Sequence, residues 1–184
     1  MKLFVLIFTL KKIPVLSWSS HDALNLKPKF VTLLYLVLGL ILFGLGETLL
    51  ITANAGVSPW TVLAQGISVK TEYSIGITTF IVSIGVLFLW LPLKQKPGIG
   101  TILNTIIISV VIHVSLPYLP SPELLVLQIL QVIIGVLIVG LGSGFYLIAN
   151  LGPGPRDGLM TGIQKMTNLS LALIRTIIEI SAVT

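Results

Sequence analysis

The sequence contains no cysteine and very few charged residues. Without cysteine there is no disulfide framework and no cysteine-ligated metal. Charged residues make up 9% of the 184-residue chain. A soluble domain has roughly 25%, so this chain has too little polar surface to remain in water. Hydrophobic residues make up 55% of it. Together these values predict an all-α fold, a polytopic transmembrane helical bundle.

The apolar residues gather in long runs that predict membrane helices. A bilayer core of about 30 Å takes roughly 20 helical residues to cross, and backbone groups in lipid must bond within their own segment. We expect such segments at 30–53, 75–93, 99–119, 124–147 and from 170 to the last residue. Residues 1–29 contain no run of that length, so we expect a cytoplasmic or interfacial tail followed by a transmembrane domain over 30–184.

The basic residues predict the orientation. With the N-terminus in the cytoplasm, nine basic residues lie inside and only Lys70 lies outside, which follows the positive-inside rule. The inner residues are Lys2, Lys11, Lys12, Lys27, Lys29, Lys94, Lys96, Arg156 and Lys165. The net charge of +5 therefore reflects the membrane orientation of the chain. We expect the lipid bilayer as a partner and no nucleic acid.

Two similar strings, residues 54–62 and 150–158, lie 96 residues apart. Aligning 39–68 with 135–164 gives 11 identities in 30 positions without a gap, which indicates an internal duplication. Because one unit holds three spans, the second enters the membrane from the opposite side, as in the inverted-topology repeats of transporters. We expect repeat one at 30–119 and repeat two at 124–184, with the last span and a half of repeat two missing.

Each string breaks the chain before a short helix, predicted at 59–68 and 155–165. Ser58 and Gly154 each precede a proline at the first helical position, and the free N–H groups of such helix starts favour an anion. Asn54 and Asn150 can hydrogen-bond the exposed backbone at each break. Two interpretations stay open: a binding site between the two helix starts, or ordinary interfacial loops with capped helices.

Five charged residues are candidates for a functional site: two in the second string and three within predicted spans. Arg156 and Asp157 occur in the second string only, and either pair with each other or line a cytoplasmic mouth. Arg175 and Glu179 are one helical turn apart, as a self-neutralising pair or as the wall of a cavity. Glu47 suggests coupling to a proton or cation, although it could instead pair with Arg175 or reach the outer interface.

The glycine and histidine positions lead to two further predictions. The Gly-x-x-x-Gly spacing of Gly140 and Gly144 indicates close helix packing. Only two histidines are present, far apart in the chain, and no serine, histidine and aspartate arrangement suits membrane depth. We therefore expect no enzyme activity, no metal and no cofactor.

Several of these strings resemble one family. The run 150–162, followed by 173–179, is similar to the second-half signature of the YczE/YitT-type family of bacterial integral membrane proteins. The runs 56–60 and 97–101 resemble its first half. The resemblance covers about residues 30–184 and implies a multi-pass protein of the bacterial cytoplasmic membrane. It implies no substrate.

The resulting hypothesis is a small permease for an anionic or zwitterionic solute. Glu47 is its expected coupling residue, and its expected binding residues are Asn54, Ser58, Asn150, Arg156, Asp157, Arg175 and Glu179. The alternative is a non-transporting membrane factor that supports a biosynthetic or signalling partner. A homodimer could complete the wall that the truncated repeat leaves open.

Overall fold

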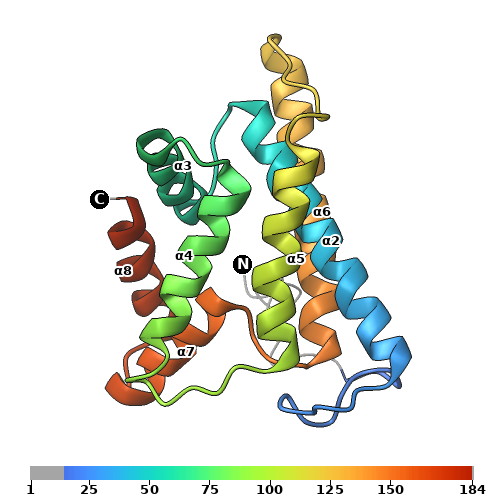
Figure 1. The fold of residues 1–184 in the computed structure, drawn as a ribbon, viewed down its shortest axis with the longest axis vertical. Coiled ribbons are helices and arrows are strands. Elements are labelled where there is room, and N and C mark those ends of the chain that lie inside the picture. The colour runs from blue at the N-terminus through green and yellow to red at the C-terminus, as the bar shows by residue number, and fades with distance from the viewer. Residues whose placement is uncertain (1–14, 184) are drawn as a thin grey trace, which may run out of the picture.

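The computed structural model describes residues 15–183, and every regular element in that range is a helix (Figure 1). The helices are α2 (Phe30–Ala53), α3 (Pro59–Thr71), α4 (Ile75–Leu89), α5 (Ile99–Ser115), α6 (Leu125–Ala149), α7 (Pro155–Thr167) and α8 (Leu171–Val183). The all-α prediction is confirmed. Residues 1–14 of the predicted tail lie outside the described range, and residues 15–29 form turns beside the end of α6.

Two helices in the described chain, α2 and α6, are long and apolar enough to cross a membrane. The pair α3 and α4 meets at a 116° bend and can count as a third span, while α5 is a shorter apolar helix. The second and third predicted segments end four residues too late, because turns follow Leu89 and Ser115. In these turns Trp90 N donates to Leu87 O at 3.1 Å and Tyr118 N to Ser115 O at 3.0 Å.

The long helices α2 and α6 pack against each other over most of their length and run in opposite directions (Figure 1). Two pairs of glycines allow the backbones of α2 and α6 to approach closely where they cross. An added Cβ at Gly142 would lie 2.6 Å from Gly39 O, and one at Gly39 would lie 2.8 Å from Gly142 O. Gly46 and Gly135 face each other in the same way, with Gly135 O 2.8 Å from a Cβ added at Gly46. The backbones therefore touch directly, as small residues permit in membrane helices.

The predicted role of Gly140 and Gly144 is wrong. A Cβ added at either position would meet no atom of the described chain within 4 Å. The packing glycine of that run is Gly142, which lies between them on the opposite side of α6. The Gly-x-x-x-Gly spacing marked the correct segment of helix but the wrong face.

The remaining helices form a second group beside the long pair. Helix α3 packs on α4 and α8, and α7 packs on the same two helices, while α5 lies between α2 and α4. In Figure 1, α3 lies at the upper left and α7 at the lower left of this group. The indole of buried Trp90 locks α4 to α7, since its Nε1 donates to Pro155 O at 2.9 Å.

Local geometry recurs at the 96-residue spacing. Asn54 and Asn150 end α2 and α6 in the left-handed conformation, with φ of 52° and 51°. Gly56 and Gly152 follow with φ of 126° and 111°, a region that favours glycine. Helices α3 and α7 each begin with proline and contain 13 residues. Proline at the first position needs no N–H partner, which explains why both starts were predictable.

Candidate functional site

A cavity of about 480 Å³ lies between the long helices and the second group. It combines residues from both motif strings with residues of the long helices and of α8. The polar and charged residues of its wall include Glu47, Ser58, Thr61, Asn104, Ser143, Tyr146, Arg156, Asp157, Arg175 and Glu179. A volume of that size suits a small solute.

The first turns of α3 and α7 both border the cavity. At the start of α3, the Ser58 hydroxyl accepts from Thr61 N at 3.4 Å and lies 2.8 Å from the Thr61 hydroxyl. The start of α7 follows Gly154 and has no side-chain cap. Helix N-termini carry partial positive charge and free N–H groups, so both ends favour an acceptor group in the cavity.

Arg156 is the cation of the cavity without a hydrogen-bonded partner. Its guanidinium lies over the ring of Trp60, 5.2 Å from the ring centre, in a cation–π contact. Glu47 and Asp157 are close enough to attract it electrostatically. It forms no salt bridge or hydrogen bond with any described residue. Arg156 and Asp157 are therefore not bonded to each other, and the N–H donors of Arg156 stay available to a ligand.

The two carboxylates near Arg156 are held by hydroxyl groups. Buried Glu47 accepts from the Thr61 hydroxyl through Oε2 at 3.0 Å, and not from Arg175. Asp157 accepts from the hydroxyl of Tyr146. Thr61 and Asp157 occupy corresponding positions of the two strings, and each bonds a side chain of the preceding long helix. Helix α3 is thus hydrogen-bonded to α2, and helix α7 to α6, beside the cavity.

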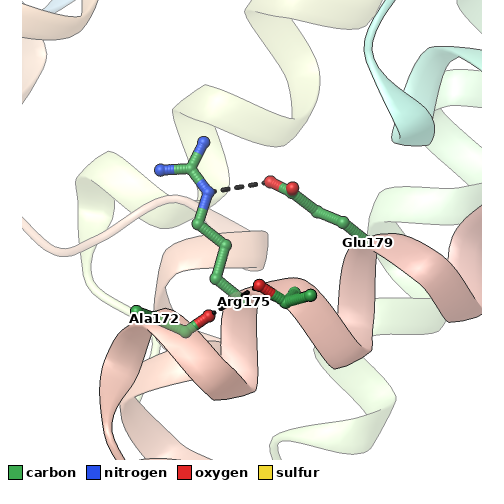
Figure 2. Close-up of polar contacts among 4 residues, drawn as sticks. Ala172, Arg175 and Glu179 are labelled. Atoms are coloured by element: carbon green, nitrogen blue, oxygen red, sulfur yellow. Dashed lines mark hydrogen bonds and ion pairs between the residues drawn. The ribbon is translucent and has the colours of Figure 1, made fainter.

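Arg175 and Glu179 form an ion pair within α8 (Figure 2). Arg175 Nε donates to Glu179 Oε1 at 2.8 Å, which matches the predicted one-turn spacing. The terminal nitrogens of Arg175 have no hydrogen-bond partner among residues 15–183. The two side chains are 67% and 36% exposed, so the pair is open to solvent or to a ligand.

Asn54 and Asn150 lie at the ends of the long helices, outside the cavity wall. Their left-handed backbone is the feature that calls for asparagine, which adopts that conformation more readily than other side chains do. The Asn150 side-chain nitrogen also donates to Ser20 O at 2.9 Å, which ties residues 15–29 to the end of α6. The structure brings the other six predicted residues together at the cavity.

Asn54 offers a test of this capping role. We expect Asn54→Val to lower the free energy of unfolding by about 1–2 kcal/mol, because a β-branched residue is strained at positive φ. Asn54→Gly should leave it nearly unchanged, since glycine adopts this backbone freely. Thermal unfolding of purified protein in detergent gives both values. Ala55→Val, one residue on, is the control, and an equal loss there would show that the strain at position 54 is not the cause.

The sequence analysis missed Tyr146 and Asn104 in the cavity wall. Both lie in apolar helices, Tyr146 in α6 and Asn104 in α5, where a single polar residue resembles an interhelical hydrogen bonder. It also missed the contact between two distant strings: Gly100 N donates to Leu151 O and the Thr101 hydroxyl to Pro153 O, each at 2.7 Å. Residues 97–101 therefore hydrogen-bond the loop between α6 and α7.

The fold and the cavity define the class: a helical membrane protein with a charged cavity that is bordered by the starts of two short helices, α3 and α7. The chain belongs to the family described as "Family of unknown function (DUF6198)", whose model matches residues 30–184. It is 37% identical over 169 residues to an uncharacterized protein of Haemophilus influenzae, covering 92% of this chain and 77% of that protein.

Two Bacillus subtilis proteins are also similar. The uncharacterized membrane protein YczE is 33% identical over 147 residues, which cover 78% of this chain and 67% of YczE. The uncharacterized protein YyaS is 25% identical over 149 residues, covering 79% and 74%. The predicted resemblance to the YczE-type family is confirmed, and the apolar helices agree with a membrane protein. No solved structure matches the chain.

Proposed function

We propose that the chain is a small-solute permease of the bacterial cytoplasmic membrane, with the cavity as its solute site. The observation that carries this proposal is that the starts of α3 and α7 border the same charged cavity. Paired breaks of this kind mark binding sites in many transporters. Interfacial helices lying flat at opposite surfaces would share no cavity, and a non-transporting membrane factor would need none.

An inverted repeat is part of the proposal, and the α2–α6 crossing supports it. Gly39 corresponds to Gly135 and Gly46 to Gly142 at the 96-residue spacing. The contacts pair Gly39 with Gly142 and Gly46 with Gly135. Such reciprocal contacts characterise a two-fold interface, here between two halves of one chain. The proposed orientation, with the N-terminus in the cytoplasm, follows from the basic residues.

The test is uptake into proteoliposomes of carbon-14-labelled mixtures of amino acids and organic acids. We expect uptake by the unaltered chain, and a loss of about tenfold or more in Arg156→Ala, because a charged hydrogen bond is worth roughly 1.5–3 kcal/mol. Glu179→Gln should also reduce uptake, since it releases Arg175 from its pair. Lys165→Ala, on the exposed end of α7, is the matched control.

Two results would count against the proposal. Uptake unaffected by both Arg156→Ala and Glu179→Gln would remove the cavity as the solute site. Absence of uptake for every labelled solute, from protein that stays folded in the liposome, would favour the non-transporting membrane factor.

A further inference from the structure

Some of the charged side chains in the cavity wall have a charged or hydrogen-bonded partner, and others do not. There are two guanidinium groups, Arg156 and Arg175, and three carboxylates, Glu47, Asp157 and Glu179. Arg175 and Glu179 neutralise each other within α8, and Asp157 is bonded by the Tyr146 hydroxyl. Among residues 15–183, Arg156 has no hydrogen bond or ion pair, and Glu47 accepts one hydrogen bond, from a neutral hydroxyl.

Neighbouring residues of α3 hold these two remaining charges. Trp60 carries the guanidinium of Arg156 on its ring, and Thr61 donates to the carboxylate of Glu47. The positive and negative groups are therefore fixed close together, and their mutual attraction is felt at Arg156. They are nevertheless not in salt-bridge contact, since Arg175–Glu179 is the only salt bridge among residues 15–183.

We propose that this site binds a small zwitterion, with its carboxylate on Arg156 and its ammonium group on Glu47. The planar guanidinium presents paired N–H donors that match a carboxylate, and Glu47 retains Oε1 as a free acceptor for an ammonium group. The two protein charges contact neighbouring residues of α3 and attract each other without a salt bridge, an arrangement that fits the two poles of an amino-acid-like compound. This inference uses the cavity of the proposed permease and rests on that function only for its biological role.

The pairing of both remaining charges, rather than net charge alone, separates a zwitterion from simple ions. The five side chains sum to one negative charge, so an added anion would raise the uncompensated charge in a partly buried site and leave Glu47 unpaired. A simple cation would neutralise the net charge but leave Arg156 unpaired. A zwitterion pairs both groups and leaves the net charge unchanged. Glu47 is thereby assigned to the ligand rather than to a coupling ion.

The test measures thermal stabilisation of the purified full chain in detergent, independently of transport. The probes are the genetically encoded amino acids with uncharged side chains and 4-aminobutanoate. We expect at least one zwitterion to stabilise the protein. The N-acetyl derivative of that compound, an anion, and its amide, a cation, should bind about tenfold or more weakly, since each loses one charged contact. Failure of all the zwitterions to stabilise would overturn the proposal, as would equal stabilisation by both derivatives.

Two substitutions assign the two poles. Glu47→Gln keeps the size of the side chain and an acceptor for Thr61, and should abolish the preference for the zwitterion over its N-acetyl derivative. Arg156→Lys keeps the charge but loses the paired donors, and should weaken carboxylate binding about tenfold or more while preserving the fold. Lys165→Ala should bind like the unaltered chain. An unchanged preference in Glu47→Gln would remove Glu47 from the ligand site.

The binding and uptake experiments can fail separately. A zwitterion that binds with the predicted dependence on Glu47 and Arg156 but is never transported would uphold the site and reject the permease. Uptake of anions at the same rate with and without Glu47→Gln would support the permease and contradict the proposed zwitterion site.

Discussion

Replacing Gly142 with alanine should lower the free energy of unfolding by about 3 kcal/mol, at the upper end of the cost of overpacking a close interface. The added Cβ would lie 2.6 Å from both Gly39 O and Phe43 N. Both are backbone atoms of α2, so no rotation of a side chain can relieve the overlap. The two long helices would have to move apart along their shared crossing.

Gly140→Ala is the matched control, two residues away in the same helix. Its added Cβ would meet nothing within 4 Å in the described chain. We expect its stability to equal or slightly exceed that of the unaltered protein, because alanine favours helix over glycine. Thermal unfolding and size-exclusion profiles in detergent measure both variants. A similar loss in the two would mean that glycine matters to α6 as a helix and not to its contact with α2.

Gly158→Ala should be at least as damaging, with a loss of about 3 kcal/mol, and should also reduce uptake. The added Cβ would lie 2.0 Å from Cζ2 and 2.4 Å from Cη2 of Trp90. That indole is 2% exposed and hydrogen-bonded to Pro155 O, so it cannot move without releasing the start of α7. The first turn of α7 carries Arg156 and Asp157, so a shift there reaches the cavity directly.

Trp90→Phe provides the check on this mechanism. Phenylalanine has no atom at Cζ2 or Cη2 of the indole, so the double variant should lose less stability than the two single variants added together. A difference of about 1 kcal/mol or more is expected for residues in direct contact. Strict additivity in thermal unfolding would show that the overlap with Trp90 is not the cause. Gly66→Ala in α3, where an added Cβ is free, is the helix-propensity control.

The starts of the helices were predictable because local chemistry determines them. Ser58 followed by Pro59 and Gly154 followed by Pro155 indicated the first residues of α3 and α7, and the structure has these bounds. The ends of α4 and α5 were not predictable to the same precision. Hydropathy continues past Leu89 and Ser115 into turns that are equally apolar, and backbone hydrogen bonding, not composition, ends these helices.

The candidate site was predictable in its members but not in their partners. Six of the predicted residues meet at one cavity because the breaks in the chain and the rare membrane charges mark it. The pairing depends on which side each helix presents, and a helix that is apolar all round gives little periodic signal. The structure was therefore needed to identify the partners of these residues: Trp60 for Arg156, Thr61 for Glu47 and Tyr146 for Asp157.

The crossing of the two long helices links the protein to bilayer thickness. Helix α6 has 25 residues and α2 has 24. At 1.5 Å per residue they are about 36 and 37.5 Å long, so each exceeds a hydrocarbon core of about 30 Å and can cross it with some tilt. We expect a thicker bilayer to hold the pair more upright. Helices α3 and α7 follow opposite ends of that pair and border the cavity, so we expect uptake to depend on the acyl chain length of the lipid, as measured in bilayers of graded thickness.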